Sequence, residues 1–221
     1  AMDALDPGPG DTVLDVGCGT GPTTIELARR VAPGGTVLGV DIAATMVDAA
    51  RRRAAGAGAD LVEFAVADAQ VDDLGAGAFD AVYSQFGVMF FADADTAFAN
   101  LHAALRPGGR LGFTCWQDVF SNEWMLVPGA AVIDVTGEPP PMPGPGQPGP
   151  FSLADVDRIE QLLTGAGFRS ISVEPSTSRI VVAEDRIELA VQGASRTGAV
   201  RAALDAEPDP AVRDRLLSAV R

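Results

Sequence analysis

A glycine-rich turn between an expected strand and an expected helix limits the folds open to this chain more than any other feature. An apolar run, Thr12–Val16, is followed at once by glycines at 17, 19 and 21 and then by Pro22. Proline suits the first turn of a helix, and apolar residues recur at helical spacing from there to Pro33. A strand, a glycine turn and a helix in this order are typical of open α/β sheets, in which ligands bind at the carboxyl ends of the strands.

Strand and helix patterns keep alternating over the next hundred residues. We expect strands at 36–40, 61–66, 79–84 and 110–116, and helices at 44–55 and 93–105. This alternation predicts an α/β fold with a doubly wound, mostly parallel sheet. Further along, the pattern predicts a helix at 153–165, a strand at 168–174, and helical segments near 185–203 and 210–221.

The chain is predicted to form a single domain over residues 1–221, interrupted by a loop at 137–150. That loop holds seven prolines and four glycines, which is too many for a helix or a central strand. Two interpretations stay open: a linker, or a flap over a binding site, because long loops inside compact domains often serve as lids.

Charge and composition limit the kinds of partner and location expected for this chain. Thirty acidic residues against sixteen basic ones give a net charge of −14, which argues against DNA or RNA as the main partner. No apolar run reaches the roughly 18 residues of a membrane span, and the first residues do not resemble a signal peptide. With only two cysteines, Cys18 and Cys115, a cytoplasmic location is expected.

Three carboxylates stand beside the glycine turn and at the ends of the next two expected strands. Asp15 lies two residues before Gly17, where it disfavours a pyrophosphate but suits a ligand with an ammonium or sulfonium charge. Asp41 ends the second strand, where a carboxylate can accept both hydroxyls of a ribose. Asp68 follows the third strand and can accept from an exocyclic amine. Taken singly, Asp41 would be a helix cap and Asp68 a turn residue, but the three acids together match a cationic nucleoside.

The spacing of the glycines separates this turn from other nucleotide-binding turns. It is G-x-G-x-G, whereas the dinucleotide fingerprint is G-x-G-x-x-G, and Pro22 stands where that fingerprint has its third glycine. The G-K-[ST] ending of phosphate-binding loops is absent as well, which disfavours nucleoside-triphosphate chemistry.

Five segments in order carry a resemblance to a known family: Val13–Gly21, Gly39–Ile42, Ala67–Ala69, Phe79–Val82 and Leu105–Leu111. They resemble the motifs of class I S-adenosylmethionine-dependent methyltransferases. Within that superfamily the chain is most similar to the small-molecule group that includes the ubiquinone and menaquinone biosynthesis methyltransferases. The resemblance is strong over residues 11–116 and weaker over 151–175. It implies a Rossmann-like sheet of the class I methyltransferase type, with the terminal strand and the N-terminal lid helices of that type expected to be missing from this sequence.

The resemblance also implies roles for individual residues. Asp15, Gly17 and Gly19 would contact the methionine end of the cofactor, and Asp41 would hold its ribose. The whole set implied to bind the cofactor is Asp15, Gly17, Cys18, Gly19, Gly21, Asp41, Ile42, Met46, Asp68, Ala69, Ser84 and Gln85. Ile42 would lie beside the adenine, Asp68 and Ala69 at its edge, and Ser84 and Gln85 near the sulfonium.

The substrate side is less defined. Its candidates are Phe86, Met89, Trp116, Glu123 and Trp124. The aromatic run that contains Phe86 and Met89 suits either the core or the wall of an apolar pocket. No catalytic base is assigned and no metal is expected. His102, the one histidine, is expected to face solvent from a helix, and Asp80 is expected to be structural.

These observations predict the transfer of a methyl group from S-adenosylmethionine to a small, apolar or natural-product-like acceptor, with S-adenosylhomocysteine as the product. Attack would be in line, and the protein would mainly align the reactants and exclude water. Two alternatives stay open. One is a protein that binds S-adenosylmethionine without methyl transfer, and the other is a nicotinamide-dependent oxidoreductase.

Overall fold

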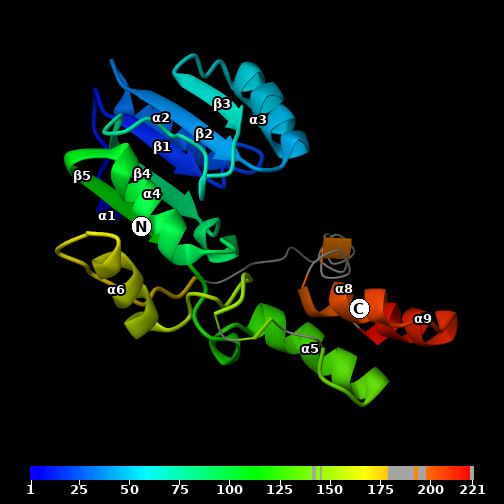
Figure 1. Cartoon of the computed structure of the whole chain (residues 1–221). Coiled ribbons are helices and arrows are strands. Elements are labelled where there is room, and N and C mark those ends of the chain that lie inside the picture. The colour runs from blue at the N-terminus through cyan, green and yellow to red at the C-terminus, as the bar shows by residue number, and fades with distance from the viewer. Residues whose placement is uncertain (141–142, 145, 179–191, 194–197, 220–221) are drawn as a thin grey trace. The chain divides into compact units, whose positions relative to one another are not determined.

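The computed structural model describes residues 1–140, 143–144, 146–178, 192–193 and 198–219 (Figure 1). They group into two compact units, and the single domain expected from the sequence stays a prediction. The first unit consists of Ala1–Trp116 together with Pro148–Val173, and the second of Gln117–Gln147 together with Glu174–Arg221. No helix in the described part of the chain is long and apolar enough to cross a membrane.

The first unit is built on a five-stranded sheet. Its strands are β1 (Thr12–Val16), β2 (Thr36–Asp41), β3 (Val62–Val66), β4 (Phe79–Gln85) and β5 (Leu105–Thr114). They lie in the order β3-β2-β1-β4-β5, and every neighbouring pair is parallel. The carboxyl ends of all five strands therefore lie at one edge of the sheet. This confirms the predicted parallel, Rossmann-like α/β fold.

Helices accompany the strands of this unit, as Figure 1 shows for α3 beside β3. They are α1 (Met2–Leu5), α2 (Pro22–Val31), α3 (Ala44–Ala57), α4 (Ala94–Ala104) and α6 (Val156–Gly165), with a 3-10 turn η1 (Val88–Phe90) after β4. Successive strand residues point to opposite faces, so Leu14 packs in one apolar cluster with α4 and α6, while Val13 packs in another with α2. Helices thus cover both faces of the sheet.

Two predicted strands differ from the observed ones. The last strand begins at Leu105, earlier than expected, and ends at Thr114, so Trp116 lies beyond it. No strand forms at 168–174. The apolar residues Phe168, Ile171 and Val173 instead pack as irregular chain against the cluster that contains α4 and α6. The alternation of apolar residues at 168–174 thus reflects burial of one side of the chain. In the described structure no strand pairs with this segment.

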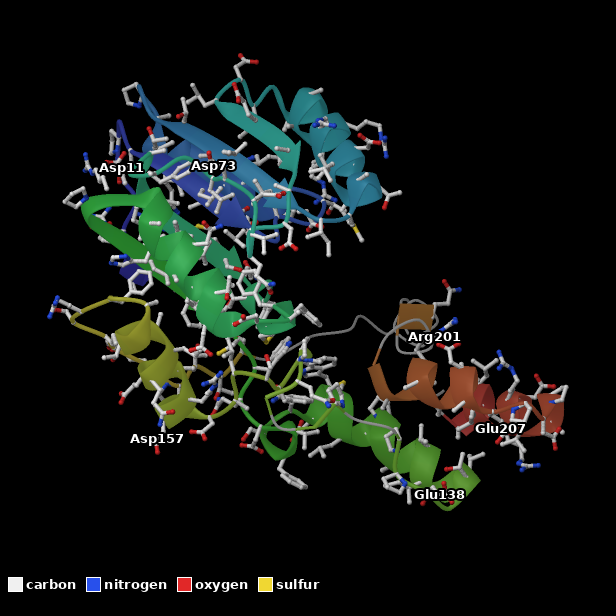
Figure 2. The ribbon with its side chains drawn as sticks, in the orientation of Figure 1. Asp11, Asp73, Glu138, Asp157, Arg201 and Glu207 are labelled. Atoms are coloured by element: carbon white, nitrogen blue, oxygen red, sulfur yellow. The ribbon has the colours of Figure 1, made fainter. Side chains whose placement is uncertain are left out.

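The second unit is helical in its described part. It contains η2 (Val119–Ser121), α5 (Glu123–Thr136), α8 (Gly198–Ala206) and α9 (Pro210–Ala219). Its core is formed by five buried residues, Val132, Val200, Ala203, Leu204 and Leu216. The helix expected near 210–221 is observed as α9, whereas most of the one expected near 185–203 lies outside the described residues. Charged side chains such as Arg201 and Glu207, labelled in Figure 2, belong to the region of α8 and α9.

The proline-rich segment 137–150 begins where α5 ends. Gly137 closes that helix in a left-handed conformation, with a φ of 77° and its N–H donating to Ile133. At the far end the chain rejoins the first unit, where Gly149 N donates to the carbonyl of Met89 at 3.0 Å. The linker and flap interpretations of this segment both stay predictions.

Candidate functional site

The glycine turn after β1 is attached to the end of β2. The N–H groups of Gly17 and Cys18 both donate to the carbonyl of Val40, at 2.9 and 3.0 Å. Gly17, Gly19 and Gly21 all have positive φ, between 55° and 83°, which a residue with a side chain rarely adopts. The turn leads into α2 with Pro22 at its first position, as the sequence predicts. The amino end of a helix therefore follows directly on a turn whose backbone a ligand can approach.

The three glycines of the turn differ in how much free space surrounds them. A Cβ built on Gly19 would meet nothing within 4 Å, so this residue borders open space. A Cβ on Gly21 would lie 3.0 Å from the ring of Phe64, and one on Gly17 would lie 2.9 Å from the Cα of Gly87. Gly19 is thus the position at which a ligand can come closest to the backbone, and Gly17 is a packing contact with the chain after β4.

A second connection joins β4 to the same turn. The hydroxyl of Ser84 donates to the carbonyl of Val16 at 2.8 Å, and this side chain is fully buried. Ser84 therefore ties the two strand ends together, and its hydroxyl is already committed. Its neighbour Gln85 is exposed, and the hydroxyl of Tyr83 donates to Gln85 Oε1 at 3.4 Å.

Asp15 lies beneath the turn with none of its surface exposed. Its Oδ2 accepts from the hydroxyls of Thr23 and Thr24 in α2, at 2.6 and 2.7 Å, while its buried Oδ1 has no hydrogen-bond partner in the described structure. Burial raises the pKa of this carboxyl to about 6, the two threonine bonds lower it in part, and the charge of Asp41 raises it further. Asp15 is a buried negative charge behind the turn, without the surface that direct ligand contact requires.

Asp41 connects the turn to the end of β2. Its Oδ2 accepts from Gly19 N and its Oδ1 from Ala43 N, both at 2.9 Å. The carboxylate is half-buried, and each of its oxygens keeps a further lone pair for a ligand hydroxyl. These two bonds hold the carboxylate beside Gly19, the glycine that borders open space.

The residues after β3 form a tight turn next to Asp41, whose carbonyl accepts from Ala67 N at 3.1 Å. The exposed Asp68 accepts from Gln70 N at 2.9 Å through Oδ1, and its carbonyl accepts from the N–H groups of Val71 and Asp72. Ala69 is almost fully buried. Asp73, labelled in Figure 2, continues this loop and accepts from Gly75 N through its carboxylate.

Exposed apolar side chains follow the ends of β2 and β3. Ile42 is 74% exposed and Met46 44%, and both belong to the set implied by the resemblance. Val66 and Val71, at 50% and 63%, are two further such residues, which the sequence analysis did not single out. The available signal was the position of Val66 at the end of β3 and of Val71 shortly after Asp68. Large apolar groups left in water next to carboxylates suit a ligand with a flat apolar face and polar edges.

The structure places the candidates for the substrate side in different environments. Phe86 has an unusual φ of 62°, and its ring stacks on that of Trp116 with centroids 4.2 Å apart. Met89 is buried, and its sulfur accepts from Trp116 N at 3.4 Å, so it belongs to the core. Phe86 and Trp116 thus form one half-buried aromatic pair beyond β4 and β5.

Glu123 and Trp124 lie at the start of α5, in the second unit, and both are exposed. Their assignment to the substrate side therefore stays a prediction. His102 is exposed near the end of α4, with its ring edge-to-face against Phe168 at 4.9 Å, as expected for a helix surface. Asp80 accepts from Thr12 N at 2.7 Å and pairs with Arg106, which agrees with a structural role.

No group of three or more His, Cys, Asp or Glu side chains within the described ranges is arranged to hold a metal ion. Cys18, inside the glycine turn, is buried, and this burial raises the pKa of its thiol to about 12. The thiol is therefore protonated at neutral pH and acts as a packing group.

This chain is similar in sequence to known methyltransferases. Residues 13–109 match the family described as "Methyltransferase domain". Nocamycin O-methyltransferase of Saccharothrix syringae is 42% identical over 136 residues, which cover 60% of this chain and 49% of the relative. A demethylmenaquinone methyltransferase of Thermus thermophilus is 44% identical over 99 residues, covering 45% and 44% of the two chains. This chain thus spans about half the length of these curated relatives.

A crystal structure of a SAM-dependent methyltransferase from Aquifex aeolicus has the same fold. It superposes with a TM-score of 0.59 over 76% of this chain and 77% of its own, at 21% identity. The expected similarity to menaquinone biosynthesis methyltransferases is confirmed by the Thermus relative. Residues 13–109, which contain the glycine turn and strands β1 to β4 of the parallel sheet, are thus similar in sequence to methyltransferase domains, and the fold agrees with that similarity.

Proposed function

We propose that this protein transfers a methyl group from S-adenosylmethionine to a small, apolar or natural-product-like acceptor. The observation that carries the proposal is the hydrogen bond between Gly19 N and Asp41. It places a carboxylate beside the one glycine of the turn that borders open space. A nucleoside with a ribose diol and a cationic side arm can bind the Asp41 carboxylate through its hydroxyls and place its side arm in the open space at Gly19.

The residues at this edge fit the cofactor from its base to its methionine end. Asp41 would accept from the ribose hydroxyls through its remaining lone pairs. Ile42 and Met46 would cover the adenine with the apolar surface that they now expose. Asp68 would accept from the exocyclic amine, and the neighbouring Ala69 N–H would donate to a ring nitrogen. The open space at Gly19 would admit the aminoacyl part close to the backbone.

Asp15 takes a different role in this proposal from the contact that the resemblance implies. Because it is buried behind the turn, it would attract the cationic end of the cofactor through space. Its unpartnered Oδ1 is consistent with a group that is completed only when a positive charge is near. The buried charge costs folding free energy, which supports a function for it.

The chain's contribution to the reaction would be alignment and exclusion of water. When bound, S-adenosylmethionine supplies a methyl group already activated by its sulfonium, so the protein need not activate it further. The fixed glycine turn and Asp41 would hold one reactant, and the aromatic pair Phe86–Trp116 would border the other. A residue that accepts a proton from the acceptor is not assigned.

The acceptor class rests on two supports. Phe86 and Trp116 offer an apolar aromatic surface next to the strand ends, and ligand pockets are lined mainly by such side chains. In addition, the names of relatives refer to nocamycin, aklanonic acid and demethylmenaquinone. A small acceptor with an apolar body agrees with both. A cytoplasmic location and the absence of a nucleic-acid partner stay predictions from the sequence.

Calorimetry and a methyl-transfer assay test the proposal together. S-adenosylhomocysteine is expected to bind and to raise the melting temperature, while NAD has no effect. Incubation with S-adenosylmethionine carrying a radiolabelled methyl group is expected to label an apolar extract of small acceptors. Binding without label in any extract would favour a protein that uses the cofactor otherwise. A thermal shift with NAD alone would favour the oxidoreductase.

The pH dependence of binding tests the role of Asp15. A nearby cation stabilises the ionised carboxylate, so binding lowers its pKa below the value of about 6 that it has without ligand. Affinity for S-adenosylhomocysteine is therefore expected to be full above pH 7 and to fall about threefold to tenfold by pH 5. Calorimetry at pH 5.0, 6.0 and 7.5 measures this change.

The variant Asp15→Asn is the control for this pH effect. It is expected to bind more weakly at pH 7.5 and to lose most of the pH dependence. In the ligand-free protein the raised pKa means that Asp15 favours folding most below its unfolded pKa and that this contribution disappears as the pH rises through about 6. The Asn variant should therefore be no less stable than the parent at pH 7.5. Equal affinity of the parent protein at all three pH values would exclude Asp15 from recognition of the cation.

A further inference from the structure

The turn after β3 is closed by hydrogen bonds between its own residues. Val71 N and Asp72 N donate to the carbonyl of Asp68 at 3.0 and 2.9 Å, and Asp68 N donates to the carboxylate of Asp72 at 2.8 Å. These bonds close the segment Asp68–Asp72 into a single turn. They fix its internal shape, but they do not fix its direction relative to the sheet.

That direction is set by helix α4. The side-chain amide of Asn100 donates through Nδ2 to the carbonyls of Ala69 and Asp72, both at 2.9 Å. A second bond runs the other way, because Asp93 N, at the start of α4, donates to Gln70 Oε1 at 2.8 Å. The turn is thus held from both ends of the helix segment between 93 and 100.

Asn100 occupies a position where its residue type is unfavourable for its own helix. Asparagine in a helix interior is less stable than alanine or leucine, because its amide competes for backbone groups. Here the amide bridges two carbonyls that lie 28 and 31 residues earlier in the chain. Asn100 therefore lowers the intrinsic stability of helix α4, and in exchange its side chain contacts the turn.

We infer that Asn100 is a positioning residue for base recognition: it sets where the turn presents the Asp68 carboxylate and the Ala69 N–H to the purine of the cofactor. This inference rests on the proposed function. Asn100 holds the carbonyl of Ala69, and the Ala69 N–H lies in the peptide unit just before that carbonyl. The loss of the Asn100 amide is therefore expected to shift the turn that presents this N–H and the Asp68 carboxylate. A substitution at Asn100 is therefore expected to change the preference for one base over another. It should affect less the binding of the ribose and of the aminoacyl arm, which Asp41 and Gly19 are proposed to contact.

The test compares two ligands on the full chain, S-adenosylhomocysteine and S-inosylhomocysteine. The inosine ring carries an oxygen in place of the amine and a hydrogen on the adjacent nitrogen, so it mismatches both the Asp68 acceptor and the Ala69 donor. We expect the parent protein to prefer the adenosine compound by about tenfold or more, because unpaired polar groups are costly. In Asn100→Ala this preference is expected to fall to about threefold or less, mainly through weaker binding of the adenosine compound.

Two further variants sharpen the result. Asn100→Asp has the same shape but sets a carboxylate against two carbonyl oxygens, so its preference is expected to be no greater than that of Asn100→Ala. Asn122→Ala is the matched control, because Asn122 Nδ2 also donates to two backbone carbonyls, those of Gln117 and Asp118, in the second unit. That control is expected to keep the full preference for adenosine. Melting temperatures of all variants verify that they are folded.

The outcomes separate this inference from the proposed function. If the parent protein discriminates between the two ligands and Asn100→Ala keeps the same ratio, Asn100 has no positioning role although the cofactor assignment stands. If Asn100→Ala weakens both ligands by one common factor, the residue acts only through overall stability, and the inference is wrong. If the parent protein binds neither compound, both the inference and the proposed function are overturned.

Discussion

Replacing Gly17 by alanine is expected to destabilise the first unit strongly. The new methyl group would lie 2.9 Å from the Cα of Gly87, and this neighbour is backbone that cannot turn aside. Gly17 also has a φ of 69°, which costs an alanine about 1 kcal/mol. Together with the overlap we expect a loss of about 3 kcal/mol or more, measured as a fall in the free energy of unfolding by chemical denaturation.

Gly19→Ala is the matched control for this prediction. Its φ of 55° carries a similar conformational cost, but an added Cβ would meet nothing within 4 Å. We therefore expect it to lose only about 1 kcal/mol of stability while its affinity for S-adenosylhomocysteine falls, because the methyl group occupies the space proposed for the ligand. If both variants are equally stable, the contact between Gly17 and Gly87 is not the cause.

The second large effect is expected for Asp41→Ala, on affinity rather than on stability. The substitution removes the carboxylate proposed to accept from both ribose hydroxyls, and it also releases Gly19 N and Ala43 N from their acceptor. Hydrogen bonds to charged groups are worth about 1.5 to 3 kcal/mol each. The affinity for S-adenosylhomocysteine, measured by calorimetry, is therefore expected to fall at least about thirtyfold, which corresponds to about 2 kcal/mol.

Two controls, a modified ligand and a variant at a second aspartate, distinguish the loss of ribose recognition from local unfolding of the protein. The 2′-deoxy form of S-adenosylhomocysteine should bind the parent protein more weakly, whereas Asp41→Ala should bind both forms almost equally. Asp155→Ala serves as the control variant, because Asp155 also accepts from a backbone N–H, that of Asp157, at the start of a helix. Undiminished affinity of Asp41→Ala would remove this residue from the site.

The sequence was sufficient for the parts of the fold that local signals determine. The strand Thr12–Val16, the glycines after it and Pro22 lie next to one another in the chain, so β1, the turn and the start of α2 could be predicted. The positions of Asp41 and Asp68 at strand ends followed from the same alternation. The five parallel strands then brought these acids to one edge, as the register of β1, β2 and β3 shows.

Other features depend on partners far along the chain, and no local pattern reveals them. The burial of Asp15 follows from two threonines of α2 that face it, which no spacing rule identifies. The commitment of the Ser84 hydroxyl to Val16 requires the register of β4 against β1. Helix α5 was not predicted from the sequence, and it contains a proline, Pro128, a residue that is unfavourable inside helices. The segment 168–174 has strand-like composition, but no neighbouring strand pairs with it in the described structure.

The close approach of Gly17 and Gly87 also sets a condition for engineering this protein. Changing acceptor preference by exchanging the segment after β4, between Gln85 and Phe91, is an obvious strategy, since that segment carries Phe86. Any donor loop, however, must keep a residue without a side chain at position 87, because a Cβ there would lie 2.8 Å from the carbonyl oxygen of Val16 and 3.1 Å from the Cα of Gly17. Libraries that randomise this loop should therefore hold position 87 constant and diversify the residues on either side of it.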